Sequence, residues 1–408
     1  MAATTVLVHF PAGFSRHSTD PKQAAAIPID PSSTVRVVLA EVLAQCGSQV
    51  VPDKSWGLYY LPDNNDQSTR IWLNNLDDII PELSDLYYAN RIRTIQVTDL
   101  DGFIKKTVNV DETQTVSVLT SLIANRFGIE DSSEFSLQKY KQFSNSQLEW
   151  LRPNSPFYKE VTAASQILIF RKKYFLFDQM VTTDSPALLH FSFLEARYGI
   201  LSGVHDITFE QAVQFAGLNM QIRYGNYDPL VHVAGFVDVM EFLPAQDRAT
   251  PFIEEYIYRE HRRLRNIEES TAKLRFLRRC SQLPTYGGSF AEAKEQCGDD
   301  GFCSDILIGA NSNCVLILNR ITKQVIGRNL LVEVNGIDIT ERCLTLKLKG
   351  RVREFVFESI PDAELFYDLI TGYMAFQRTI REQTNLATFA AKASLIIPRS
   401  ASIGDLRY

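Results

Sequence analysis

The chain has 408 residues, 45% of them hydrophobic and 22% charged, a composition typical of several folded domains and unlike that of a disordered chain. Its formal net charge of −6 argues against a dedicated nucleic-acid binder, which usually carries a basic excess. The sequence contains neither an apolar run of about 18 residues nor the pattern of a secretory signal. The six cysteines form no C-x-x-C pair, so we expect reduced thiols in a cytoplasmic protein.

Catalytic signatures are missing from the sequence. It contains no phosphate-binding loop, dinucleotide-binding, zinc-protease or nucleophile-elbow motif. The six histidines are scattered, and no two of them have the spacing of three or four residues that places metal ligands on one helix face. We therefore expect a protein that is not an enzyme, with no catalytic residues, no metal site and no cofactor.

An internal repeat organises the N-terminal part of the chain. Residues 29–47 overlay residues 110–128 without a gap and with five identities. Each copy reads as a strand, a threonine at the helix N-cap, a helix with apolar periodicity and a terminating glycine. Strands, then a helix, then further strands are typical of a ubiquitin-like β-grasp module. The repeat predicts two such lobes, at residues 1–88 and 89–174.

A helical segment follows, which we assign to residues 175–281. A capping box at 208–211 predicts the start of a helix that ends near Gly217. Apolar residues at helical spacing also predict helices over 184–200 and 254–280. From 259 to 279 there are eight basic and three acidic residues, which indicate either a solvated helix face or a contact with an anionic surface.

The pattern returns to short strands after Pro284. Turn signals, among them Asn335-Gly336, separate seven runs with β propensity. These runs lie near 287–295, 304–308, 314–319, 324–327, 330–334, 343–348 and 354–357. A helix opened by Ser359 closes the unit, with Leu365, Leu369 and Phe376 on one face. This order predicts a PH/PTB-like β-sandwich lobe at 282–380, followed by a linker or tail at 381–408.

From about residue 4 to residue 378 the chain resembles the talin head, a FERM domain with an extra N-terminal ubiquitin-like lobe. The segments that carry the resemblance are Leu100–Gly102, Arg171–Phe175, Phe215–Gly217, Phe242–Pro244 and Thr285–Phe290. The resemblance implies an α+β multidomain protein with two ubiquitin-like β-grasp lobes, one all-helical lobe like the acyl-CoA-binding protein, and one PH/PTB-like β-sandwich lobe.

The resemblance also implies a function, that of a cytoskeletal adaptor at the inner face of the plasma membrane and at adhesion sites. Such a head binds the cytoplasmic tail of an integrin β-like receptor by adding the peptide as a strand to the PTB-like lobe, and it links to actin through a downstream rod. Where animal talins have an Arg-Trp pair, this chain has Gly336-Ile337, which changes the pocket for a bulky tail residue. The expected peptide-binding residues are Leu331, Val332, Val334, Asn335, Gly336, Ile337 and Tyr373.

A membrane contact is the second implication of the resemblance. The expected lipid-binding residues for anionic phosphoinositides are Lys294, Arg262, Arg263, Arg265, Lys105, Lys106, Lys172 and Lys173. Talins have a lysine-rich loop where this chain has Asp299 and Asp300, so we expect weak lipid binding. A Ras-family small GTPase is a further candidate partner. The alternative functions are a regulatory FERM module of a signalling enzyme and a small-GTPase effector.

Overall fold

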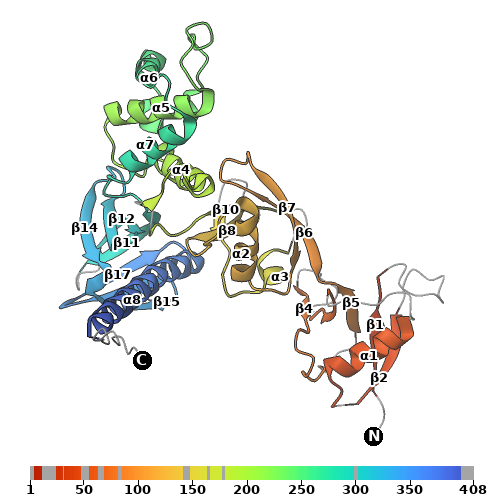
Figure 1. Cartoon of the computed structure of the whole chain (residues 1–408). Helices are drawn as coiled ribbons and strands as arrows, with labels where there is room; N and C mark the ends of the chain where they lie inside the picture. The colour runs from red at the N-terminus through yellow and green to blue at the C-terminus, as the bar shows by residue number, and fades with distance from the viewer. Residues whose placement is uncertain are drawn as a thin grey trace, which may run out of the picture. The chain divides into compact units, whose positions relative to one another are not determined.

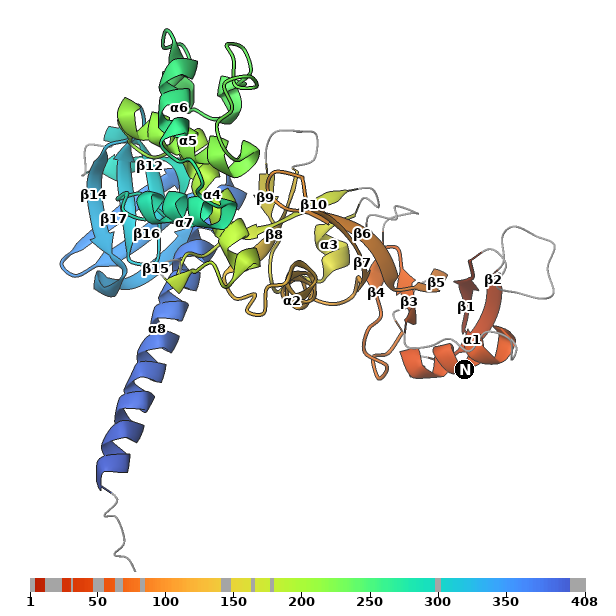
Figure 2. The same ribbon diagram turned by 45° about the horizontal axis from the view of Figure 1, so that its top comes forward.

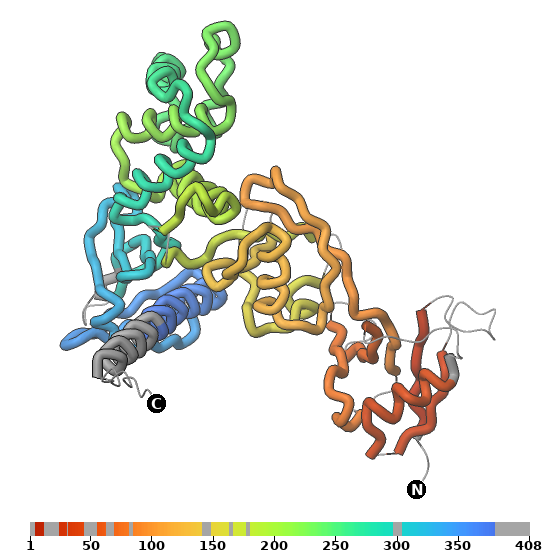
Figure 3. Tube along the Cα trace, in the orientation of Figure 1, coloured from red at the N-terminus to blue at the C-terminus, as the bar shows by residue number. Residues whose placement is uncertain are grey.

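The computed structural model describes residues 4–11, 24–30, 32–46, 55–62, 69–80, 85–140, 148–162, 166–176, 180–297 and 302–396. The chain divides into two compact units, Met1–Lys173 and Tyr174–Tyr408, which are described separately (Figures 1 and 2). Figure 3 traces the chain along its Cα positions in the orientation of Figure 1. No described helix has both the length and the apolar character needed to cross a membrane.

The first unit begins with a five-stranded sheet in the order β2-β1-β5-β3-β4. Val6, Val8 and Leu58 on the strands pack with Val38 and Val42 on the helix, so one face of the sheet is buried beneath α1. The elements of this sheet are β1 (Thr4–His9), β2 (Ala24–Ile29), α1 (Val35–Cys46), β3 (Trp56–Tyr60), β4 (Ile71–Trp72) and β5 (Asp85–Asn90).

A second five-stranded sheet has the order β7-β6-β10-β8-β9, which repeats the order of the first sheet strand for strand. The two copies of the internal repeat therefore have the same strand order. The boundary between them lies between Asn90 and Ile92 rather than at residue 88. The elements are β6 (Ile92–Thr98), β7 (Lys105–Asp111), α2 (Val116–Phe127), β8 (Phe135–Tyr140), β9 (Leu148–Trp150), α3 (Phe157–Glu160) and β10 (Ile167–Lys172).

The two helices of the repeat also begin and end at homologous positions. Thr115 is the N-cap residue of α2 with extended backbone, although its side chain makes no capping hydrogen bond. Gly128 ends α2 with a left-handed φ of 81°, a conformation in which glycine avoids the steric cost of a Cβ. The corresponding Gly47 lies outside the described residues.

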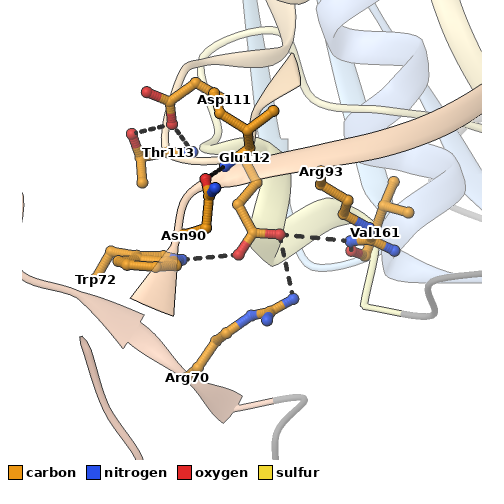
Figure 4. A network of polar contacts seen from close by, with 9 residues as sticks. Arg70, Trp72, Asn90, Arg93, Asp111, Glu112, Thr113 and Val161 are labelled. Atoms are coloured by element: carbon orange, nitrogen blue, oxygen red, sulfur yellow. Dashed lines mark hydrogen bonds and ion pairs between the residues drawn. The ribbon is translucent and has the colours of Figure 1, made fainter. Parts of the chain in front are cut away.

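A buried carboxylate joins the two sheets of the first unit (Figure 4). Glu112, which is 3% exposed, follows β7, and its carboxylate accepts a 2.9 Å hydrogen bond from the indole N–H of Trp72 on β4. Arg70 and Arg93 approach the other carboxylate oxygen at 3.3 and 3.8 Å. The side chain of Tyr158 packs in the same apolar cluster as Trp72. Contacts from both sheets therefore meet at one carboxylate.

The second unit begins with helices. The predicted capping box is confirmed, because Thr208 accepts from the backbone of Gln211 while the Gln211 side chain accepts from the backbone of Thr208. The helix that it opens continues past Gly217 to Tyr224. The helical elements are α4 (Pro186–Leu201), α5 (Phe209–Tyr224), η3 (Val239–Glu241), η4 (Ala245–Asp247), α6 (Ile253–Arg262) and α7 (Glu269–Cys280).

The single helix predicted over 254–280 is wrong, since α6 and α7 are separate helices. Asn266 between them has a left-handed φ of 64°. Its backbone N–H donates to the side chain of Asn226 at 2.7 Å, and the two side-chain amides bond each other at 3.1 Å. A pair of asparagines from distant parts of the chain therefore accompanies the break.

The remainder of the second unit is a seven-stranded antiparallel sheet in the order β14-β13-β12-β11-β17-β16-β15. The helix α8 lies against β12, β15, β16 and β17 (Figure 1). It ends at Ile396, so the segment from 381 that we expected to be a linker or tail begins as helix. The elements are β11 (Ser289–Cys297), β12 (Phe302–Ala310), β13 (Cys314–Asn319), β14 (Val325–Leu330), η5 (Leu331–Glu333), β15 (Val334–Thr340), β16 (Cys343–Leu348), β17 (Arg351–Phe357) and α8 (Ile360–Ile396).

Candidate functional site

The strand β15 lies at one end of the seven-stranded sheet. It pairs with β16 on one side and with no other described strand on the opposite side. A sheet edge of this kind presents backbone N–H and C=O groups that an extended peptide can pair with. The sequence predicted the strand at 330–334, but these residues end β14 and form η5, and the strand begins only at Val334.

The segment Asn335-Gly336 continues this strand, so the predicted turn is wrong. Val334 pairs with Leu348 and Gly336 with Lys347, which leaves Asn335 as an unpaired bulge residue. The bulge accommodates the extra residue without ending the ladder to β16. It lies at the exposed edge, where it changes which backbone groups face outward.

The predicted peptide-binding side chains divide into surface and core. Asn335 is exposed, Gly336 and Ile337 are half-buried, and Val332 in η5 is 55% exposed. Val334 is buried at the start of β15, so only its backbone could contribute to an added strand.

Leu331 and Tyr373 do not belong to the binding surface. Both side chains are buried in the core between the sheet and α8. The Tyr373 hydroxyl donates to the carbonyl of Gly287 at 3.2 Å, and the backbone N–H of Phe175 donates to it at 3.3 Å. Tyr373, a residue of α8, therefore anchors this helix to the segments of Gly287 and Phe175, and its complete burial does not fit the expected role in peptide contact.

A tyrosine at the start of the second unit fixes α8 from another side. The ring of Tyr174 packs edge-on against Tyr373 and Phe376, with centroids at 5.1 and 5.2 Å. Its hydroxyl lies so close to Gly372 that a Cβ at this position would clash with it. Burial, with a smaller contribution from Asp368, raises the pKa of Tyr174 to about 12. Sequence reasoning missed this contact, because Tyr174 and Gly372 are nearly 200 residues apart.

Two of the expected lipid-binding lysines are buried. The Lys172 side chain is 0% exposed, and its ammonium group lies 3.1 Å from the carboxylate of Glu134, which is itself 6% exposed. Lys173 is 4% exposed, with its ammonium group 5.7 Å from the centre of the Trp150 ring. Both residues are therefore removed from the predicted membrane surface. The sequence showed only three consecutive basic residues and could not show their partners.

The other expected lipid-binding residues are exposed. Lys105 and Lys106 lie on β7, at the edge of the second sheet, and Lys294 lies on β11. Asp299 and Asp300, the acidic positions of the loop that follows β11, lie outside the described residues.

The three arginines after the middle of α6 have different surroundings. The Arg262 guanidinium lies 4.8 Å from the centre of the Tyr227 ring. Arg263 forms a 2.6 Å ion pair with Glu260, whereas Arg265 has no ion-pair partner among the described residues. Because α6 ends at Arg262, Arg263 and Arg265 belong to the connection between the helices. Within the described ranges no group of three or more His, Cys, Asp or Glu side chains could hold a metal ion.

Comparison with known sequences identifies relatives of the chain. The profile of the FERM central domain matches residues 179–290, which contain α4 to α7. Talin-B of Dictyostelium discoideum is 28% identical over 391 residues, 95% of this chain and 15% of that protein. Talin-1 of Gallus gallus is 26% identical over 362 residues, 80% of this chain and 14% of that protein. The chain thus spans about 15% of the length of these relatives.

Solved structures with a similar fold include the FERM and C-terminal domain complex of Drosophila Merlin. The two structures match with a TM-score of 0.57 and 17% sequence identity, and the match covers 72% of this chain and 98% of the Merlin chain. The MyTH4-FERM domain of human Myosin 7b matches this structure with a TM-score of 0.58 and 16% sequence identity. This match covers 71% of this chain and 61% of the Myosin 7b chain. The fold is α+β and FERM-like, and residues 179–290 match the FERM central domain. Since the talin relatives cover most of the sequence, the chain is a talin-head-like FERM protein.

Proposed function

We propose that this chain is a non-enzymatic cytoskeletal adaptor head that binds the cytoplasmic tail of an integrin β-like adhesion receptor. The proposal includes two ubiquitin-like β-grasp lobes, a helical lobe like the acyl-CoA-binding protein and a PH/PTB-like lobe. The repeated strand order of the first unit and the closing helix of the last sheet support this composition. Linkage of adhesion sites to actin, at the inner face of the plasma membrane, is the cellular role that the similarity to talins suggests.

The observation that carries the proposal is the unpaired edge of β15 beside α8. A receptor tail in extended conformation would pair with this edge through main-chain hydrogen bonds, which depend little on the tail sequence. Half-buried Ile337 and Ile339 on β15, and Tyr367 and Met374 on α8, pack against the core beside it. Such side chains would supply specificity in place of the Arg-Trp pair that animal talins have.

A proline substitution tests the role of this edge. Asn335 has no partner residue in β16, so Asn335→Pro spares the register of the sheet while it removes one backbone donor. Loss of one hydrogen bond predicts a weakening of tail binding by about tenfold. The assay is binding of a labelled tail peptide of the Asn-Pro-x-Tyr type to the purified chain.

The opposite sheet edge provides a matched control. On β14 the ladder to β13 shifts between Val325 and Gly327, so Ile326 is also an unpaired bulge residue, 60% exposed. Ile326→Pro should leave tail binding unchanged. Equal weakening by both substitutions, or none by either, would place the peptide elsewhere.

A membrane contact forms the second part of the proposal. The exposed cations Lys105, Lys106, Lys294, Arg262 and Arg265 are its candidates, and each added positive charge near an anionic leaflet contributes about 1 kcal/mol. The contact should be weak and should decrease steeply with added salt, because these side chains are exposed and screened.

One observation favours a small GTPase as an additional partner. The strand β7 is an edge strand of the second sheet and carries Lys105 and Lys106, while Arg126 is exposed in the last turn of α2. An edge strand flanked by cations could pair with an acidic edge strand of another protein. Charge reversal at Lys105 and Lys106 should abolish such binding without affecting the tail peptide.

A further inference from the structure

A pocket of about 240 Å³ lies within the second unit, apart from the proposed peptide edge. Neither β15 nor any of the expected lipid-binding residues contributes to its lining. Four segments that are distant in sequence form its walls. They are the segment before the helices (Phe175, Leu176), the segment after α7 (Ser281, Leu283, Pro284, Tyr286), the turn between β12 and β13 (Asn311, Ser312, Asn313), and Arg328 on β14.

The aromatic wall of the pocket is fixed by its neighbours. The rings of Phe175 and Tyr286 pack edge-on with centroids 5.8 Å apart. A Cβ on Gly287, which has a left-handed φ of 67°, would lie 2.9 Å from the Cβ of Phe175, so the backbone approaches this residue closely. The backbone N–H of Phe175 is held by the Tyr373 hydroxyl. This wall is therefore formed before any ligand binds.

The polar wall is equally well supported. The side-chain oxygen of Asn311 accepts hydrogen bonds from the backbone N–H groups of Asn313 and Cys314, both at 2.9 Å. The Gln377 side chain on α8 donates to the carbonyl of Ser312 at 2.5 Å. These bonds hold the turn in one conformation, with its amide and hydroxyl side chains lining the pocket. Preformed walls reduce the entropic cost of binding.

The chemistry of the lining is asymmetric. Among the described residues, no carboxylate lines the pocket, and the one charged group in its lining is the Arg328 guanidinium. Arg328 is exposed and has no ion-pair partner among the described residues. Asparagine and serine side chains also line the pocket, whereas Phe175, Leu176, Leu283, Pro284 and Tyr286 provide an apolar surface.

We propose that this pocket binds a small organic anion, namely a carboxylate or phosphate attached to an aromatic or aliphatic group about the size of one amino-acid side chain. Arg328 binds the anion, since a guanidinium forms two parallel hydrogen bonds with carboxylate or phosphate oxygens. The side chains of Asn313 and Ser312 can donate further hydrogen bonds. The apolar part of the ligand packs on Phe175 and Tyr286.

The test uses phenyl phosphate as the probe and ligand-observed NMR on the purified chain. Phenyl phosphate should bind with a dissociation constant below about 1 mM, as expected for a ligand of this size. Arg328→Gln should weaken binding by about tenfold through loss of the charged hydrogen bonds. The matched control is Lys323→Gln, which removes a half-buried charge from the β13–β14 hairpin outside the pocket and should have no effect.

Two further probes examine each half of the proposed ligand. Benzyl alcohol lacks the charge and inorganic phosphate lacks the apolar group, so both should bind at least about tenfold more weakly than phenyl phosphate. A capped phosphotyrosine that binds more tightly than phenyl phosphate would indicate a peptide as the source of the anion, whereas equal binding would indicate a free small molecule. Absence of phenyl phosphate binding, equal binding of inorganic phosphate, or an unchanged affinity in Arg328→Gln with the melting temperature retained would each overturn the proposal.

Discussion

A buried histidine should make the second unit sensitive to acid. His205, between α4 and α5, is 5% exposed, and its Nδ1 lies 2.6 Å from the hydroxyl of Thr285, which precedes β11. On its other side the ring adjoins α4, where a Cβ on Gly199 would lie 2.5 Å from Nε2. Burial lowers the pKa of His205 to about 4. The neutral imidazole of His205 therefore connects α4 to Thr285, in the segment that leads into β11.

The direction of the pH effect follows from the two pKa values. The unfolded chain takes up a proton near pH 6.5, whereas the folded chain does so only near pH 4, so stability is lost as the pH falls between these values. A difference of about 2.5 pKa units corresponds to about 3 kcal/mol below pH 4 and about 2 kcal/mol at pH 5. The matched variant is His205→Asn, which keeps a side-chain partner for Thr285 but does not titrate.

The assay is urea denaturation between pH 7 and pH 5, followed by far-ultraviolet circular dichroism. The three tryptophans (Trp56, Trp72 and Trp150) all lie in the first unit, so their fluorescence provides an internal reference for that unit. Between pH 7 and pH 5 the wild-type chain should lose about 2 kcal/mol more unfolding free energy from its second unit than His205→Asn. Parallel pH dependence of the two proteins would refute the reasoning, because all other titrating groups are common to both.

Three more predictions rest on other charged groups. Glu134→Gln and Lys172→Met should each destabilise the first unit by about 3–5 kcal/mol in urea denaturation, because each removes one partner of a buried ion pair, whereas replacing both residues together should cost much less. Lys172→Met should leave vesicle binding unchanged, because its side chain is buried. Glu112→Gln should make the relative orientation of the two sheets of the first unit less uniform, which residual dipolar couplings would measure. An unaltered alignment tensor would contradict the inference that this carboxylate holds the two sheets together. Arg262→Glu combined with Arg265→Glu should reduce co-sedimentation with phosphoinositide vesicles at low salt, and unchanged binding would exclude the connection after α6 from the membrane surface.

Features that depend on adjacent residues could be predicted from the sequence. The capping box at Thr208 and the helix-ending Gly128 were identified correctly, because each forms hydrogen bonds within a few residues. The repeated strand order could also be predicted, because each copy carries the same succession of strand, cap, helix and glycine.

Features that depend on distant partners could not be predicted. The apolar periodicity over 254–280 continues through Asn266, and the hydrogen bonds to Asn226 that accompany the break come from a residue 40 positions earlier. Lys172 reads as a surface charge until the neighbouring strand β8, which Glu134 precedes, is placed beside β10. In both cases the local signal was present, and a tertiary contact outweighed it.

The proposed peptide-binding edge illustrates the same distinction within one segment. Asn335-Gly336 is a strong turn signal, yet β16 pairs on both sides of it and the extra residue is absorbed as a bulge. Whether a strand lies at the edge of a sheet is a property of strand order, which no local sequence pattern records. Each of the two edge strands, β14 and β15, contains a bulge of its own. However, β15 lies against α8 and carries half-buried isoleucines, whereas β14 exposes Ile326. The proposal favours β15 over β14 because α8 packs beside β15, and the Asn335→Pro and Ile326→Pro pair compares the two edges directly.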